Sequence, residues 1–153
     1  SYTNYEEIDV DGNRTGIKVT GPKKITKTGM FNYCWPGCLT VMFDANKVGL
    51  IQIEDIKKNN DYAMWLKVCK KADCYLLDEY LAQYRKGRVG SVSTHSIKTM
   101  IGWHYKLYDE AENMGMAKSL FRAIIIFRKR GMCYVLRKNW SSRTGRLRKN
   151  GTD

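Results

Sequence analysis

The stretch that decides the fold is Asn60–Lys67, with the sequence NDYAMWLK. Apolar side chains recur there and in the next five residues at the spacing of one helical face, whereas three lysines fall on the other face. This pattern predicts an amphipathic helix that begins near Asn60. It places the carboxylate of Asp61 in the first turn and Trp65 about one turn further along the same surface.

Asp61 can take two roles at this position. An Asn or Asp at the start of a helix most often caps the free backbone N–H groups. The same N–H groups and the helix dipole also favour the ionised carboxylate, which can accept the proton of an attacking hydroxyl. Trp65 either enters the core or lines a binding pocket. The local sequence favours the cap and the core, and leaves both alternatives open.

The segments before this helix predict strands. Residues 2–10 mix β-branched with aromatic side chains and lead into the hairpin-turn sequence Asp11-Gly12-Asn13, after which residues 15–20 return as a second strand. Residues 25–35 suggest no more than one short helical turn. The nearly continuous apolar run at 37–43 predicts a buried central strand.

The segments after the helix predict two short strands and a helical C-terminus. We expect the strands at 74–77 and 80–84, separated by Asp78-Glu79. Helical patterns follow at 94–113, 116–130 and 132–139. Strands and loops, one helix, two strands and further helices together predict an α/β fold with a mixed sheet.

Positive charge is concentrated near the C-terminal end. The net charge is +12, of which residues 1–112 contribute +2 and residues 113–153 contribute +10. We therefore divide the chain into an α/β part at 1–112, basic amphipathic helices at 113–140, and a tail at 141–153 that we expect to be disordered. No apolar run approaches the roughly 20 residues that span a bilayer, and no secretory signal is recognisable.

Basic side chains are interleaved with aliphatic ones over residues 116–138. A basic amphipathic helix binds anionic membrane surfaces, where each Lys or Arg contributes about 1 kcal/mol. The same apolar face could instead pack on another part of the protein or on a second subunit. A nucleic-acid-binding module is a third alternative, although aliphatic rather than aromatic interleaving does not favour base stacking. A protein-interaction domain without catalysis is also compatible.

The cysteines do not predict a disulfide framework, because there are five of them, an odd number. Cys34 and Cys38 are separated by three residues rather than by the two of a thioredoxin-like pair. A zinc site that adds Cys69 and Cys74 lacks the usual short ligand spacing, so buried thiols are the expectation. A reducing, cytoplasmic setting fits this usage.

Five stretches occur in an informative order: Tyr5–Asn13, Gly37–Phe43, Asn60–Lys67, Leu77–Glu79 and Tyr84–Ser93. Taken together they resemble the C-terminal half of a family-2 glycosyltransferase with a GT-A fold, a nucleotide-diphospho-sugar transferase-like mixed sheet. The resemblance covers most of residues 1–112. It implies transfer of a sugar, with inversion, from a nucleotide-sugar donor to a saccharide or lipid-linked acceptor. The implied setting is bacterial cell-surface polysaccharide synthesis, at the inner face of the cell membrane.

The resemblance also implies roles for individual residues on the acceptor side. The acid that matches Asp61 is the proposed catalytic base of such enzymes. Asn60 and Trp65 would then contact the acceptor. Many members have Glu or Gln where this chain has Asn60, so the chain offers no second acid beside Asp61.

On the donor side, the resemblance points to Arg85, Ser91 and Ser93. These residues match a region near the donor in related enzymes, where a guanidinium and hydroxyl groups could bind diphosphate oxygens. The alternative is a surface arginine followed by a flexible loop.

The resemblance implies no metal site in this chain. Asp9-Val10-Asp11 has the Asp-x-Asp spelling with which these enzymes hold the donor's metal ion, but the following Gly12-Asn13 makes the segment a turn. We therefore assign no metal to Asp9 or Asp11. Magnesium or manganese would belong to the full-length enzyme and its N-terminal half, which the resemblance implies is missing from this chain. The fragment alone is expected to be inactive and to pair with the missing half or as a homo-oligomer.

Overall fold

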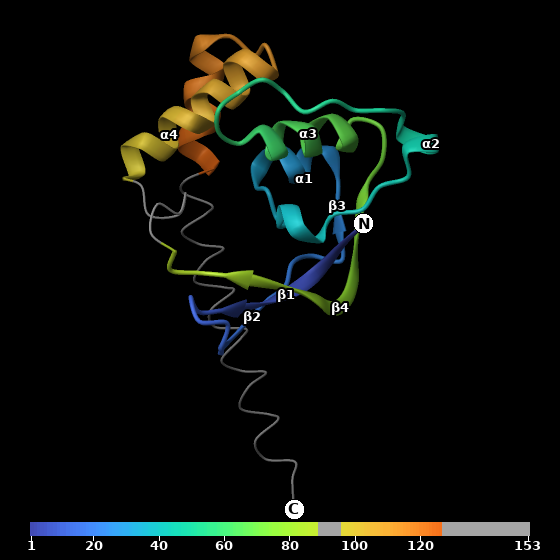
Figure 1. Cartoon of the computed structure of the whole chain (residues 1–153). Helices are drawn as coiled ribbons and strands as arrows, with labels where there is room; N and C mark the ends of the chain where they lie inside the picture. The colour runs from blue at the N-terminus through green and yellow to red at the C-terminus, as the bar shows by residue number, and fades with distance from the viewer. Residues whose placement is uncertain (89–95, 127–153) are drawn as a thin grey trace, which may run out of the picture.

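The computed structural model of the chain describes residues 1–88 and 96–126. They form the expected α/β arrangement, with helices gathered on one side of a curled sheet (Figure 1). The elements are β1 (Tyr2–Ile8), β2 (Arg14–Val19), β3 (Lys24–Ile25), α1 (Lys27–Asn32), the 3-10 helix η1 (Cys38–Thr40), α2 (Ala45–Val48), α3 (Asn60–Cys69), β4 (Cys74–Arg85), α4 (Ile97–Lys106) and the π-helix η3 (Leu107–Ala111). A further helix covers residues 116–126.

The sheet has four strands in the order β2-β1-β4-β3. The two central strands, β1 and β4, run parallel, whereas β2 and β3 pair with their neighbours antiparallel. Parallel neighbours require a long crossover, and here the chain between β1 and β4 supplies β2, β3 and the helices α1 to α3. The sheet is therefore mixed, as the sequence predicts.

The predicted hairpin at the start of the chain is confirmed. β1 and β2 pair with Tyr5 opposite Val19, and the turn contains Gly12 at φ +94°. The carboxylate of Asp9 closes this turn, because its Oδ1 accepts the backbone N–H groups of Asp11 (2.9 Å) and Asn13 (2.8 Å). Hydrogen bonds from Asn13 lower the pKa of Asp9. Asp9 is thus a turn-stabilising residue.

The prediction of two short strands separated by Asp78-Glu79 is wrong, because β4 is one strand of 12 residues. The pairing with β1 shifts inside it: Thr3 lies opposite Leu77, but Asn4 lies opposite Tyr80. Asp78 and Glu79 therefore bulge out of the ladder without ending the strand. The fully buried Asn4 holds the bulge, since its Nδ2 donates to Asp78 Oδ1 at 2.7 Å.

The prediction of a buried central strand at 37–43 is also wrong. The run forms the 3-10 helix η1, in which the backbone N–H and the hydroxyl of Thr40 both donate to the carbonyl of Gly37, at 2.9 and 2.8 Å. Only Val41 makes a bridge, with Tyr2. An apolar run of this length is compatible with either geometry, and its Val41 and Phe43 still pack against the core.

The predicted helix at Asn60 is confirmed as α3, and it supplies the centre of the core. Its buried residues are Tyr62, Ala63, Trp65, Leu66 and Cys69. Two lysines on its outer face form ion pairs, Lys67 with Glu54 and Lys70 with Glu112 (2.6 Å). The second pair links α3 to the residue that follows η3.

The helices after β4 are confirmed within the described part of the chain, with different limits. The predicted helix at 94–113 is divided into α4, whose first turn is capped by Ser96, and the wider η3. Residues 127–153, with the helix predicted at 132–139 and the tail at 141–153, lie outside the described residues. Over residues 1–88 and 96–126, no helix is long and apolar enough to cross a membrane.

Candidate functional site

Asp61 lies in the first turn of α3 and is half-buried. Its Oδ1 accepts the backbone N–H of Tyr62 at 2.8 Å, and its own N–H donates to Asn60 Oδ1 at 2.9 Å. Asn59, just before, has a left-handed backbone with φ 60°. The side chain of Asn60 therefore contacts the backbone of Asp61, and it can orient the carboxylate only indirectly. Capping and proton transfer are thus compatible roles for the same group.

The Asp61 side chain lines a pocket of about 210 Å³. Five separate parts of the described chain meet at this pocket: β1, the connection between α1 and η1, the start of α3, α4, and the helix at 116–126. The lining residues are Tyr5, Tyr33, Cys34, Trp35, Pro36, Gly37, Asn59, Asp61, Tyr62, His104 and Ile126. One carboxylate therefore lines a cavity together with three tyrosines, one tryptophan and one histidine.

The aromatic wall comes from the connection between α1 and η1. Tyr33 follows α1 in an extended conformation, and Trp35 comes two residues later. Their ring centroids are 4.7 Å apart with an interplanar angle of 64°, an edge-to-face pair. Pro36 is buried and Gly37 lies close beneath the ring of Tyr5. The connection is irregular in its backbone and is held in place by its side chains.

Two buried tyrosines fix this wall by capping the end of α1. Tyr62 donates its hydroxyl to the carbonyl of Met30 at 2.6 Å, and Tyr108 donates to the carbonyl of Phe31 at 2.9 Å. The last carbonyls of a helix lack intrahelical partners, so these hydroxyls take the place of missing N–H groups. Burial raises the pKa of both tyrosines, and they remain neutral donors.

His104 is a further pocket residue. Its side chain is 5% exposed, its ring packs edge-on against Tyr62 with centroids 6.2 Å apart, and its Nδ1 lies 2.9 Å from the carbonyl of Met100. If Nδ1 carries the proton, it donates to that carbonyl and Nε2 is the acceptor nitrogen. The contact within α4 therefore orients the imidazole beside the pocket.

Trp65 does not share the pocket of Asp61. It is 8% exposed, packs edge-on against Phe43 with centroids 6.5 Å apart, and lines a different cavity of about 160 Å³. Asn60 does not line the Asp61 pocket either. Acceptor contacts by these two residues stay predictions, and the geometry gives them indirect roles, Trp65 in the core and Asn60 in the backbone of the helix start.

Arg85 contacts the β1–β2 turn. Its Nη1 donates to the carbonyl of Val10 at 2.5 Å and to that of Asp9 at 3.3 Å. It lies outside the Asp61 pocket. Ser91 and Ser93, its predicted partners at the donor, fall in the 89–95 segment, outside the described residues. The donor-side assignment therefore stays a prediction for all three.

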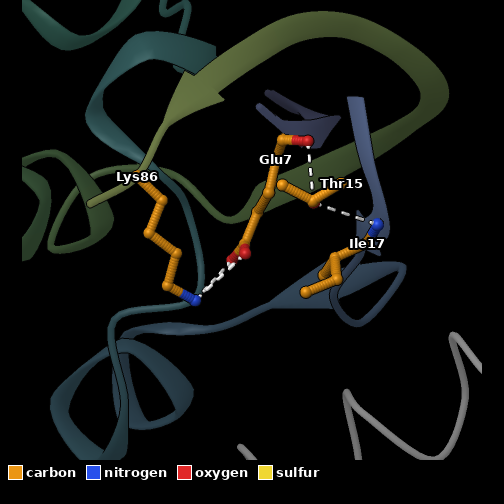
Figure 2. Close-up of polar contacts among 4 residues, drawn as sticks. All are labelled: Glu7, Thr15, Ile17 and Lys86. Carbon is orange, nitrogen blue, oxygen red and sulfur yellow. Dashed lines mark hydrogen bonds and ion pairs between the residues drawn. The ribbon is translucent and has the colours of Figure 1, made fainter. Parts of the chain in front are cut away.

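Lys86 holds the same end of β4 through a buried acid. Its Nζ lies 3.0 and 3.2 Å from the two carboxylate oxygens of Glu7, which is 8% exposed (Figure 2). On the neighbouring strand, Thr15 donates its hydroxyl to the backbone carbonyl of Glu7 at 2.9 Å and accepts the N–H of Ile17 at 3.3 Å (Figure 2). The last residues of β4 are thus anchored to the hairpin, and the chain turns away only at Gly87, with φ +86°.

The cysteines of the described residues are free thiols, at positions 34, 38, 69 and 74. Burial and the nearby Cys74 raise the pKa of Cys69 to about 12, and partial burial together with the Asp61 carboxylate raises the pKa of Cys38. Over residues 1–88 and 96–126, no three His, Cys, Asp or Glu side chains converge as a metal site would require. The four-cysteine zinc site therefore has no support.

The sequence predicted Asp61 as a site residue, which stays a prediction, and it did not predict the pocket that Asp61 lines. Trp35 was visible only as a residue between two cysteines, and His104 as one polar residue in a helical pattern. The one usable signal was the Tyr-Cys-Trp-Pro-Gly segment at 33–37, where two aromatic residues at i and i+2 precede a Pro-Gly turn.

Sequence comparison relates the chain to proteins named glycosyltransferases. TuaG of Bacillus subtilis, a candidate teichuronic acid biosynthesis glycosyltransferase, is 35% identical over 86 residues, which are 56% of this chain and 34% of the relative. An uncharacterised glycosyltransferase of Haemophilus influenzae is 29% identical over 127 residues, 82% of this chain and 49% of the relative.

WfaP of Escherichia coli, named a UDP-Glc:α-D-GlcNAc-diphosphoundecaprenol β-1,3-glucosyltransferase, is 34% identical over 101 residues, 66% of this chain and 39% of the relative. No protein-family model and no solved structure matches the chain. The chain spans between a third and a half of the length of these relatives. It is therefore related in sequence to a part of each of these three proteins named glycosyltransferases.

Proposed function

We propose that the chain is the acceptor-side part of an inverting family-2 glycosyltransferase with a GT-A fold, acting in cell-surface polysaccharide synthesis. The observation that carries this proposal is the half-buried Asp61 carboxylate, fixed at the start of α3 and facing a pocket in a chain related to glycosyltransferases. The substrates would be a nucleotide-sugar donor and a saccharide or lipid-linked acceptor.

The proposed chemistry needs one base and one open approach. An acceptor hydroxyl in the pocket loses its proton to Asp61 as its oxygen forms a bond to the anomeric carbon of the donor. The bond from that carbon to the nucleotide diphosphate breaks on the opposite face, and the diphosphate oxygen takes the electron pair. Attack from the opposite face inverts the anomeric configuration. The position of Asp61 in the first turn of α3 supports this role, because Asp61 lines the pocket there and its carboxylate is held by the backbone N–H of Tyr62.

The donor side is proposed on the resemblance. Arg85, Ser91 and Ser93 would bind the diphosphate, with the clamped end of β4 as the fixed start of that loop. We place Mg²⁺ or Mn²⁺ in the full-length enzyme and outside this chain, because Asp9 is engaged in its turn and the described residues bring no three His, Cys, Asp or Glu side chains together as a metal site. In the same proposal the enzyme works at the cytoplasmic face of the cell membrane.

A membrane surface is the proposed partner of residues 116–138. In the described part of this segment, four large apolar side chains are exposed on the helix: Met116 (72%), Leu120 (48%), Phe121 (64%) and Ile124 (47%). Residues 113–153 carry a net charge of +10, which suits an anionic leaflet. The chain should sediment with vesicles containing 30% phosphatidylglycerol and lose binding in Phe121→Ser. If Phe121→Ser still binds the vesicles, this apolar face does not contact the membrane, and packing on another subunit or domain becomes the favoured alternative.

The test of the proposed function is Asp61→Asn in the full-length protein. A panel of radiolabelled UDP-sugars is offered with N-acetylglucosaminyl diphosphate lipid, the acceptor type in the name of the Escherichia coli relative. Removing a general base should lower transfer about 10²- to 10⁴-fold while binding of the UDP-sugar persists. Asp55→Asn, an exposed acid outside the pocket, is the control and should keep full transfer. Unchanged turnover in Asp61→Asn would remove the assignment.

A further inference from the structure

The Asp61 pocket has two kinds of surface with different chemistry. Its lining includes the aromatic residues Tyr33, Trp35 and Tyr5 and the polar residues Asn59 and Asp61. Tyr33, whose backbone is extended, and Trp35 are two residues apart, and their rings lie side by side. Their edge-to-face contact at 4.7 Å fixes the angle between the two rings.

The segment that carries Tyr33 and Trp35 is closely held at both of its ends. A Cβ on Gly37 would lie 3.1 Å from Leu39 Cδ2 and 3.4 Å from Tyr5 Cε1, so the backbone fits closely against its neighbours there. At the other end of the segment, Tyr62 and Tyr108 cap α1 immediately before Tyr33. Rings held at both ends of a short segment present a surface of fixed orientation to a ligand.

The size and charge of the pocket restrict the ligand. About 210 Å³ lies below the roughly 300–1,000 Å³ of pockets for drug-sized ligands, which leaves room for one sugar ring. Among the described residues that line it there is one carboxylate and no Lys or Arg. A phosphate or a uronate would meet the negative charge of Asp61, and none of these described residues would offset that charge, whereas a neutral ring brings no charge to offset.

A neutral pyranose matches both surfaces. Its axial C–H bonds form an apolar face that packs on the negative face of an aromatic ring, and its hydroxyls project from the rim toward polar groups. We propose, on the basis of the proposed function, that Trp35, with Tyr33 edge-on beside it, is the platform for the acceptor's terminal neutral sugar. The ring lies against Trp35, and this contact determines which hydroxyl reaches Asp61. Trp35 is then the residue that sets the linkage.

The inference is tested by sugar binding to this chain, without any transfer reaction. Saturation-transfer NMR titrations use methyl α-N-acetylglucosaminide and methyl β-glucoside as neutral probes and methyl β-glucuronide as the charged one. Both neutral probes should bind more tightly than the glucuronide. Trp35→Ala should weaken their binding about tenfold, the effect of one lost aromatic contact, and Trp35→Phe should restore part of it.

The matched control is Trp103→Ala on α4, whose ring lies under Lys58 Nζ at 5.5 Å and does not line the pocket. It should bind like the unmodified chain, and circular dichroism should show both alanine variants folded. Wild-type affinity in folded Trp35→Ala, no binding of a neutral probe to the unmodified chain, or glucuronide bound as tightly as glucoside would each overturn the inference. If Asp61→Asn abolishes transfer but sugar binding does not depend on Trp35, the proposed function holds and the inference about Trp35 fails. If sugar binding depends on Trp35 but the full-length protein transfers no sugar, the inference about Trp35 holds and the proposed function fails.

Discussion

The hydroxyl group of Tyr62 is small, buried and central to the candidate site, and its removal gives a sharp test of the structure. In Tyr62→Phe the ring stays and only the oxygen is lost. The carbonyl of Met30, which accepts that hydroxyl at 2.6 Å, then lacks its donor in a buried place. A buried acceptor left unsatisfied costs about 1–3 kcal/mol. We expect the free energy of unfolding to fall by about 2 kcal/mol, which lowers the Tm by about 4–8 °C at this chain length.

The assay is urea unfolding followed by circular dichroism, with two companion variants. Tyr108→Phe, which uncaps the carbonyl of Phe31, should cost a similar amount, and the double variant should cost less than the two effects added, because the two hydroxyls are 3.4 Å apart. Tyr105→Phe removes a hydroxyl bonded to Asp109 at the surface and should leave the midpoint unchanged. If Tyr62→Phe unfolds at the same urea concentration as Tyr105→Phe, the capping of α1 by tyrosine is wrong.

Three further predictions concern the core, the pocket and the sheet. Leu66→Ala, at a fully buried position, should lower the free energy of unfolding by about 2–5 kcal/mol. The control Leu81→Ala, 62% exposed on β4, should change it by no more than about 0.5 kcal/mol. Similar losses in the two variants would contradict the assigned core. Asp61→Asn removes a negative charge near Cys38, and this removal should lower the pKa of the Cys38 thiol. Iodoacetamide alkylation of the Cys38 peptide, measured by mass spectrometry, should therefore reach half its maximal rate at lower pH than in the unmodified chain. An identical pH profile would place the two groups too far apart. Lys86→Met leaves the Glu7 carboxylate without its cation and should lower the free energy of unfolding by about 1–2 kcal/mol. This is less than for a fully buried pair, because Lys86 is 44% exposed. The control Lys106→Met, at an exposed pair 4.0 Å long, should lower it less, and equal urea midpoints would contradict a stabilising Lys86–Glu7 pair.

The elements that the sequence predicted correctly are those whose signals are local. The β1–β2 hairpin follows from alternation and the Asp11-Gly12-Asn13 turn, and α3 follows from its helical period. Both signals depend on neighbours within a few residues. The carboxylate at the start of α3 could be found for the same reason, because a residue's position in a helix is part of the helix pattern.

The elements that the sequence missed depend on distant partners. Asp78-Glu79 resembles a break between strands, but Asn4, 74 residues earlier, holds those residues as a bulge within β4. The run at 37–43 has the composition of a strand, yet within it only Val41 forms a bridge to β1. The pocket walls were missed for the same reason, since they come from five parts of the chain that meet only after folding.

The capping of α1 by Tyr62 and Tyr108 also determines when this helix can become stable during synthesis. Tyr62 and Tyr108 lie 32 and 77 residues downstream of the carbonyls to which they donate. A six-residue helix does not persist without such help. At about 5–20 residues per second, the ribosome needs about 4–15 s to add those 77 residues. During those seconds the nascent chain displays Tyr33 and Trp35 unpacked, so a translational pause or a truncated message would expose this segment to chaperones and proteases.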